Sequence, residues 1–332
     1  MTIRTVARRA GVSAMTVSNV LNGRKVTAET RAAVQRAIAE LNYTPNTAAR
    51  QLATASTVVI GFLHGRVEHS FFSELLVGAL NAATREGAQI LLQSVDIEAP
   101  DGARAAIRAL RERGANAILL PSFVAEAMTR RGEAAEPGLP LVAVAPGEPL
   151  PGIPSVRIDE FAAARALTEL LIAKGRRRIG FIGPPAELPL SDVRRGGYLA
   201  ALQAHGLPSP PELSVAGARS LEACIAAADA LLDLTAPPDA IFAWNDDFAA
   251  CALTAAHRRG LDVPGNLAVA GFDDSPLASK VWPPLTTVRQ PLAEMAAWAV
   301  QTLVRQVRGD AEAPPADALL DYAIVPRGST GD

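Results

Sequence analysis

The first 45 residues contain two short helical patterns that meet at a glycine, and this feature constrains the chain most. Val6 marks the apolar face of the first pattern, and Val17 and Val20 mark that of the second. Gly11 can adopt the positive φ that ends a helix, and Ser13 is a natural N-cap for the helix that follows. Two helices joined by so short a turn form a helix-turn-helix, whose second helix enters the major groove of DNA.

A third apolar-periodic stretch, over residues 32–41, would brace this pair. Charge favours a nucleic-acid partner, because residues 1–56 carry eight basic side chains against two acidic ones. This segment has a net charge of +6 in a chain of net charge −2, so the remaining residues carry −8. A basic head on an acidic body suits phosphate contact at one end. The alternative is a small helical bundle that serves only as a lid.

Length, cysteine content and the lack of long apolar runs limit the classes of protein to which this chain can belong. A chain of 332 residues can hold a small module and a two-lobed core. Cys224 and Cys251 are the only cysteines and lie in apolar helical patterns, so we expect a reduced, buried pair and no zinc finger. The amino terminus lacks a signal segment and no apolar run is long enough to span a bilayer, which indicates a cytoplasmic protein.

The chain resembles the lactose/galactose-repressor family of regulators. The motifs that carry the resemblance are Val6-Ala7, Ala10-Gly11-Val12-Ser13, Thr16-Val17-Ser18, Val20-Leu21-Asn22, Glu40-Leu41-Asn42-Tyr43 and Pro45-Asn46. The resemblance continues along the rest of the chain. It implies a small all-α DNA-binding domain followed by an α/β two-lobed core with parallel sheets, like that of periplasmic sugar-binding proteins. Because one head covers one half-site, it also implies a homodimer on a pseudo-palindromic operator of double-stranded DNA.

We expect DNA contacts from the second helix, its flanks and the segment after the head. These residues are Thr2, Ser13, Ala14, Met15, Thr16, Ser18, Asn19, Asn22, Arg24, Lys25, Tyr43, Asn46, Arg50 and Leu52. Residues 46–56 have helix-forming composition, but a helix of about two turns is marginal on its own in water. The resemblance makes them a hinge helix with Leu52 as a minor-groove wedge that unstacks a base step. The alternative is a plain linker.

Beyond residue 57, apolar runs of strand length alternate with helical stretches, which predicts parallel sheets covered by helices. Strands are expected at 58–63, 90–95, 117–120, 141–144, 179–182, 240–243 and 267–272, and helices at 72–85, 102–113, 162–174, 193–205, 221–234, 248–259 and 292–308. The predicted domains are the head at 1–45, the hinge at 46–56 and the core at 57–332. By the resemblance, one lobe holds about 57–157 and 288–318, and the other about 158–287 and 319–332 with a final strand at 319–325.

Ligands of open parallel sheets bind at the carboxyl ends of strands, so polar and aromatic residues there are candidates for an effector site. They are His69, Phe71, Phe72, Asp159, Asp192, Arg194, Asn245 and Asp273. Carboxylates and amides suit hydroxyl groups and aromatic faces suit sugar rings, so we expect a small sugar-like effector. The resemblance places Arg194, Asn245 and Asp273 in the family's pocket. Asp192 stands where the family often has arginine, which leaves the pocket's shape open. For Asp247 and Asp274 we favour helix capping.

The sequence contains no glycine-rich phosphate loop, no nucleophile elbow and no histidine pair at metal-binding spacing. We therefore expect that the protein is not an enzyme and that it binds no cofactor, no metal and no membrane. The predicted function is a sequence-specific transcriptional regulator, a repressor whose operator affinity is controlled allosterically by a small effector. The alternatives are a sugar-binding or transport protein and an α/β sugar-processing enzyme, which turnover of a bound ligand would identify.

Overall fold

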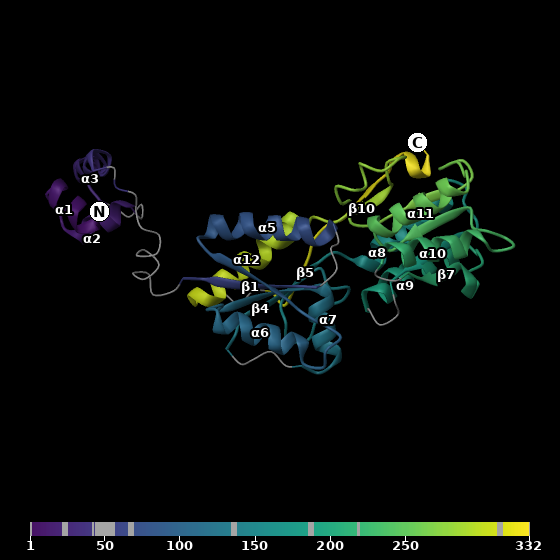
Figure 1. Ribbon diagram of the computed structural model, residues 1–332, viewed down its shortest axis with the longest axis horizontal. Helices are drawn as coiled ribbons and strands as arrows, with labels where there is room; N and C mark the ends of the chain where they lie inside the picture. Colours follow the sequence, from purple (N-terminus) through teal and green to yellow (C-terminus); the bar gives the residue numbers. More distant parts are fainter. Residues whose placement is uncertain are drawn as a thin grey trace. The chain divides into compact units, whose positions relative to one another are not determined.

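The computed structural model describes residues 2–21, 26–41, 43, 57–65, 70–133, 138–184, 189–217, 220–310 and 315–331. The chain divides into two compact units, Met1–Thr57 and Val58–Asp332. We call them the head and the core and describe each by itself. Their helices and strands are labelled in Figure 1.

The described part of the head consists of three helices, α1 (Ile3–Ala10), α2 (Ala14–Leu21) and α3 (Ala28–Glu40). Each helix contributes a valine to a small buried core, namely Val6, Val17 and Val34. Gly11 ends α1 in the left-handed conformation with a φ of 69°. This turn aims α2 across α1, so the predicted helix-turn-helix is confirmed.

The first lobe of the core is built on a parallel sheet with the strand order β11-β5-β4-β3-β1-β2. Its strands are β1 (Val59–His64), β2 (Gln89–Ser94), β3 (Ala117–Pro121), β4 (Leu141–Val144), β5 (Ser155–Arg157) and β11 (Asp317–Leu319). The helices α5 (Ser70–Glu86) and α12 (Leu292–Arg308) cover one face, and α6 (Gly102–Glu112) and α7 (Ser122–Arg130) cover the other. Because both faces are covered, the central strands are apolar throughout.

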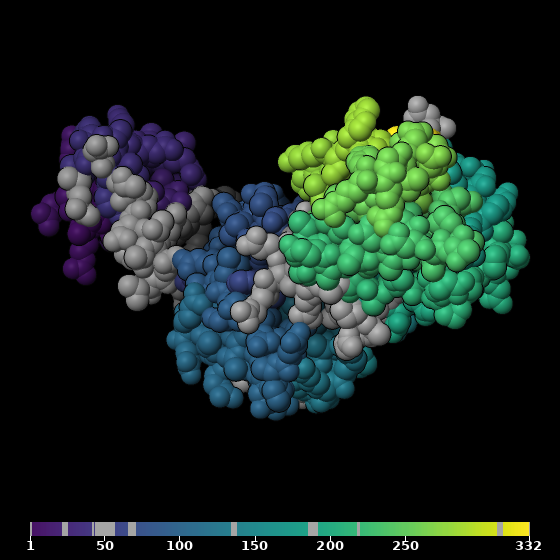
Figure 2. Space-filling model, turned by 45° about the vertical axis from the view of Figure 1, so that its right-hand side comes forward, coloured from purple at the N-terminus to yellow at the C-terminus, as the bar shows by residue number. Residues whose placement is uncertain are grey.

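The second lobe is built on a smaller parallel sheet with the strand order β7-β6-β8-β9. Its strands are β6 (Ile179–Gly183), β7 (Ser214–Ala216), β8 (Ala240–Ala243) and β9 (Ala268–Ala270). The helices α8 (Glu160–Ala173) and α9 (Pro189–Ala204) pack on one face, and α10 (Leu221–Leu232) and α11 (Asp246–Arg258) on the other. Two single-turn helices, η1 (Pro211–Leu213) and η2 (Gly328–Thr330), complete the described elements. In Figure 2 the part of the first lobe before residue 157 is blue to teal, and much of the second lobe is green.

Three segments connect the lobes. They follow β5, β9 and β11, and the second and third contain the strands β10 (Thr287–Arg289) and β12 (Ala323–Val325). These two strands pair antiparallel in a ribbon of their own. The predicted final strand at 319–325 is therefore wrong as a single element, because β11 joins the first lobe's sheet and β12 joins this ribbon. The helix α7 and the strand β7 had not been predicted.

Candidate DNA-binding surface and effector pocket

The helix α2 presents a polar and a flexible apolar surface on the side away from the core of the head. The Ser13 hydroxyl accepts a hydrogen bond of 3.1 Å from the backbone N–H of Thr16, which confirms Ser13 as the N-cap. Val17 and Val20 are buried, whereas Met15 is 69% exposed. An exposed apolar side chain of this size on a small unit is available for contact with a partner.

The other predicted DNA-contact residues fall into two groups. Thr2 is exposed, and Ala14, Thr16, Ser18, Asn19 and Tyr43 are half-buried on the head. Asn22, Arg24, Lys25, Asn46, Arg50 and Leu52 lie outside the described residues, as does the predicted hinge at 46–56. The described DNA-contact residues thus lie on the head, most of them on α2, and the hinge stays a prediction.

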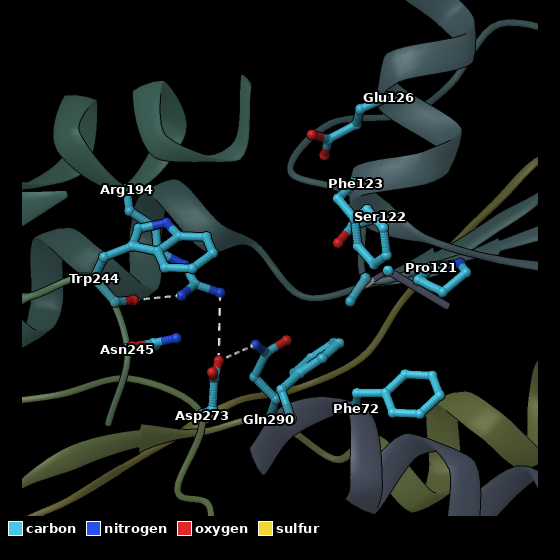
Figure 3. A pocket seen from close by; sticks show the side chains of 13 residues that line it. Phe72, Pro121, Ser122, Phe123, Glu126, Arg194, Trp244, Asn245, Asp273 and Gln290 are labelled. Carbon is cyan, nitrogen blue, oxygen red and sulfur yellow. Dashed lines mark hydrogen bonds and ion pairs between the residues drawn. The ribbon is translucent and has the colours of Figure 1, made fainter. Parts of the chain in front are cut away.

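A pocket lies between the two lobes of the core, with a cavity of about 80 Å³. The first lobe lines it with Gly65, Phe71, Phe72, Pro121, Ser122, Phe123, Glu126 and Ala145, and the second with Arg194, Trp244, Asn245 and Asp273. Gln290, on the segment between β10 and α12, completes the lining. Figure 3 shows these side chains around one opening. Five of the predicted effector residues therefore meet here, and His69 lies outside the described residues.

Arg194 is held in place by hydrogen bonds from almost all of its guanidinium donors. Its Nε donates to Glu160 Oε2 at 2.6 Å and its Nη2 to Glu160 Oε1 at 3.1 Å. Nη1 donates to the Trp244 carbonyl at 2.5 Å, and Nη2 also reaches Asp273 Oδ1 at 3.4 Å. The guanidinium stacks 3.7 Å above the Phe272 ring. With a side chain only 2% exposed, Arg194 is a fixed element of the pocket wall.

Asp273 and Gln290 link the second lobe to a connecting segment. Gln290 Nε2 donates to Asp273 Oδ1 at 2.8 Å (Figure 3). Asp273 has a φ of 104°, an unusual conformation for a residue with a side chain, and its N–H donates to the Val288 carbonyl at 2.8 Å. Strained backbone at a binding site persists because the surrounding hydrogen bonds impose it.

Burial controls the protonation of the acids near Arg194. Burial raises the pKa of Asp273 well above its usual range, although Arg194 acts in the opposite direction. Burial also raises the pKa of Asp246 to about 6, against the hydrogen bonds that it accepts from Thr287 Oγ1 and the Ser275 N–H. Burial alone would lower the pKa of Arg194, but Glu160 and Asp273 raise it. Arg194 is therefore the fixed cation of this cluster.

Two predicted effector residues do not line the pocket. Asp159 is exposed and caps α8, where its Oδ1 accepts a hydrogen bond of 2.9 Å from the N–H of Ala162. Asp192 is exposed in the first turn of α9. Both precede a buried charged residue, since Glu160 follows Asp159 and Arg194 lies two positions after Asp192. Each residue of a helix turns the side chain by about 100°, so a shift of one or two positions separates the solvent face from the buried face.

The capping predictions for two further aspartates need correction. Asn245, not Asp247, is the N-cap of α11, because its Oδ1 accepts a hydrogen bond of 2.9 Å from the N–H of Phe248. Asp274 caps no helix in the described chain. Its carboxylate instead pairs with Arg289 Nε at 2.6 Å and with Arg327 Nη2 at 2.5 Å. It thereby joins the two connecting segments that contain β10 and β12.

Several lining residues were missed from the sequence. Ser122, Phe123 and Glu126 follow β3 directly, so the rule that ligands bind at strand carboxyl ends would have found them had α7 been recognised. Gln290 follows the three-residue strand β10, which is too short to give a periodic signal. In the described residues, no group of three acids, histidines or cysteines could hold a metal ion, and no helix could cross a membrane.

Comparison with known proteins accounts for both units. The family described as "Bacterial regulatory proteins, lacI family" matches residues 2–46, and "Periplasmic binding protein-like domain" matches residues 168–330. The HTH-type transcriptional regulator GalS of Salmonella typhimurium is 35% identical to this chain over 93% of the chain and 91% of GalS.

Solved structures agree over the full length. The Lac repressor dimer bound to operator and the anti-inducer ONPF has a TM-score of 0.78 at 26% identity, covering 100% of this chain and 99% of that one. The transcriptional regulator CelR in complex with cellobiose has a TM-score of 0.70 at 29% identity, covering 99% of both chains. Both units and their order along the chain are thus shared with these regulators, and the chain belongs to the lacI family of bacterial regulatory proteins.

Proposed function

We propose that this transcriptional regulator is a repressor that binds a pseudo-palindromic operator and is controlled by a small hydroxylated molecule in the core pocket. The observation that carries the proposal is the convergence of Arg194, Asn245 and Asp273 with aromatic side chains from both lobes. A few fixed polar groups in a largely apolar pocket are typical of small-molecule sites. The CelR complex with cellobiose and the Lac repressor complex with ONPF support a ligand of this kind.

The connecting segment gives the pocket a mechanical role. A ligand that engages Asp273 acts on the hydrogen bond to Gln290, and Gln290 immediately precedes the first turn of α12. Ligand binding at the lobe boundary therefore biases the arrangement of the lobes. An effector changes DNA affinity only by its different affinity for the two arrangements. The predicted hinge at 46–56, with Leu52 as its wedge, would transmit that difference to DNA.

On DNA, we propose that α2 lies in the major groove. Ala14 and Met15 would offer apolar contact to base edges, and Ser18 and Asn19 would offer hydrogen bonds. Ser13 and Thr16 at the start of the helix would face phosphates. Since one head reads one half-site, two copies are required for a pseudo-palindrome. The solved Lac repressor complex is a dimer on its operator.

The helices α5 and α12 are the proposed dimer surface. Val77 and Leu80 on α5 are 56% and 45% exposed, and their spacing places them on one helix face. Burying this pair in a partner would remove apolar surface from water. Sedimentation of the full chain should show a dimer, and Val77→Asp with Leu80→Asp should shift it to a monomer. A dimer that persists in the double variant would place the interface elsewhere.

The proposed function is tested by selecting DNA fragments with the full chain and then screening sugars for release of the selected fragment. We expect enrichment of one pseudo-palindrome and release by at least one sugar. Asp273→Asn should keep operator affinity and blunt release, because loss of a buried charge-assisted hydrogen bond costs about 1.5–3 kcal/mol of ligand affinity.

Asp159→Asn is the matched control, since it removes an exposed aspartate outside the pocket and asparagine caps helices equally well. It should respond to the sugar like the original chain. Failure to enrich any sequence, or unaltered release from Asp273→Asn, would contradict the proposal. Turnover of the sugar would instead support an enzyme.

A further inference from the structure

We infer that the molecule bound in the core pocket carries a protonated amine, either on a sugar or on another compact organic amine. The inference rests on the proposed ligand-binding role of this pocket. It is drawn from the balance of charge on the pocket wall, the hydrogen bonds that Arg194 already makes, an acceptor without a partner and the aromatic lining.

The second lobe buries three acids and one cation close together, of which Asp273 and Arg194 line the pocket. Glu160, Asp246 and Asp273 are buried around Arg194, which is the one cation among the buried side chains of the described residues. Glu160 is paired bidentately to Arg194 and Asp273 shares the same guanidinium at 3.4 Å, so one cation serves three carboxyl groups. Buried charge that is not compensated is costly, so the protein either protonates these acids or meets a cation.

Arg194 has little capacity left for an anionic ligand. Four hydrogen bonds to Glu160, Trp244 and Asp273 use four of its five N–H groups. Its position above Phe272 covers one face of the guanidinium. A phosphate or carboxylate in the cavity would therefore meet Asp273 and Glu126 without a free arginine fork to bind it.

The cavity holds a buried donor without a partner, Trp244 Nε1, and on its Asp273 side a pair of neighbouring acceptors. The Gln290 side chain is buried, with 3% of the residue exposed, and its Oε1 has no hydrogen-bond partner among the described residues. Its Nε2 is fixed on Asp273, so the free oxygen and the carboxylate are neighbours. Glu126, on α7, lines the cavity from the wall opposite Asp273 in Figure 3, and its Oε1 accepts a hydrogen bond of 2.9 Å from the N–H of Gly147. An ammonium group donates three hydrogen bonds, which the Asp273 carboxylate and Gln290 Oε1 are placed to accept.

The remaining lining suits the carbon skeleton of a cation. Phe71, Phe72 and Phe123 come from the first lobe and Trp244 from the second. Aromatic faces attract ammonium groups through their quadrupole, more strongly when the site is desolvated. They also pack against the apolar side of a ring. A neutral sugar would use the aromatic faces but bring no cation to the Asp273 carboxyl group.

The test is calorimetric titration of the full chain with matched probes. Glucose, galactose and mannose are each compared with the corresponding 2-amino sugar and 6-phosphate, and ethanolamine and agmatine supply a protonated amine without a sugar ring. We expect at least one amine to bind about tenfold or more tightly than its neutral counterpart or, for the non-sugar amines, than glycerol. The phosphates should not bind. Tight binding of an amino sugar, or of ethanolamine or agmatine, identifies the source of the amine.

Variants of pocket residues test whether the preference for an amine over a neutral ligand arises in the pocket. Asp273→Asn should reduce the ratio of amine to neutral affinity to about one, and Asp159→Asn should leave it unchanged. If Asp273→Asn fails to fold in thermal melting, Glu126→Gln takes its place with the same expectation. Binding of a neutral sugar or phosphate as tightly as its amine, an unchanged ratio in the folded pocket variant, or no binding by any amine would overturn the inference.

This outcome is separable from that of the proposed function. A neutral sugar that binds and releases the operator would leave the proposed function intact and contradict the amine. Specific amine binding by a chain that selects no DNA sequence would do the reverse.

Discussion

Asn19 lies half-buried on α2, one residue beyond Ser18 and two beyond the buried Val17. Asparagine pairs with adenine N6 and N7, whereas the arginine common at this position in the resembled family pairs with guanine O6 and N7. Asn19→Arg should therefore shift base preference towards guanine at one symmetric position of each half-site, by about 1–3 kcal/mol. Affinity measured across an operator library mutated at single positions checks this. Uniformly tighter binding with the same preferred sequence would mean that Asn19 contacts only phosphate.

The raised pKa of Asp246 predicts that the stability of the core depends on pH. This pKa is about 6 in the folded core against an ordinary value of 3.8, so between these values the folded state retains a proton that the unfolded state loses. Stability contributed by this group is therefore lost as pH rises from about 4 to about 6, by about 3 kcal/mol at most. Asp246→Asn lacks this dependence. Urea unfolding at pH 4 and pH 7 should show the variant gaining stability relative to the original chain as pH rises.

A constant difference between the two chains across this range would show that Asp246 is ionised in the folded core. The hydrogen bonds from Thr287 and Ser275 provide the control, because their partial loss in the asparagine variant is independent of pH. Only the slope of the stability difference against pH reports the carboxyl group.

Pocket residues that follow long strands could be predicted from the sequence, whereas those at the beginnings of helices could not. Asn245 and Asp273 follow well-defined strands, and Arg194 was predicted from the resemblance to the regulator family. Asp159 and Glu160 both follow β5, and only helix geometry shows which of the two adjacent acids is buried. The pairing of Glu160 with Arg194 joins residues on two helices, and such contacts leave no periodic signal in a single sequence.

At the scale of elements, the close packing of α8 against α9 depends on a glycine. A Cβ at Gly197 would lie 2.3 Å from the Phe161 carbonyl oxygen and 2.9 Å from the Arg165 nitrogen, so the backbone would have to shift. At the neighbouring Gly196, a Cβ would meet only the Phe161 ring at 3.4 Å. The two positions thus form a matched pair within one helix.

Gly197→Ala should destabilise the core by about 1–3 kcal/mol through overpacking. Gly196→Ala should be neutral or stabilising by up to about 1 kcal/mol, because alanine favours the helix over glycine. Chemical denaturation of both variants measures the difference. Equal effects of the two substitutions would show that α8 and α9 are not in close contact at Gly197.

The long elements of the core could be predicted from the sequence because their apolar periodicity extends over many residues. The strands β1, β3, β4, β6 and β8 and most helices lie within a few residues of their predicted positions. The short elements β7 and β10 and the helix α7 have three to nine residues and little periodicity. Their positions depend on tertiary contacts, and the Gln290 side of the pocket was missed for that reason.

At the scale of the whole molecule, the core joins two sheets through segments that also carry pocket residues. Asp274 pairs with Arg289 and Arg327 on two of these segments, while the adjacent Asp273 lines the pocket. Adjacent residues thus line the pocket and connect the lobes, and the proposed control depends on this arrangement. The factor by which the ligand changes DNA affinity must then equal the factor by which DNA changes ligand affinity, because both shift the same equilibrium between lobe arrangements.

Reciprocity is the most direct test of this account. The affinity of the full chain for its selected operator is measured with and without saturating effector, and the affinity for the effector is measured with and without saturating operator. If the core pocket controls DNA binding, the two ratios are equal and each is about fivefold or more. An effector affinity that is unchanged by the operator would contradict control of DNA binding from the core pocket.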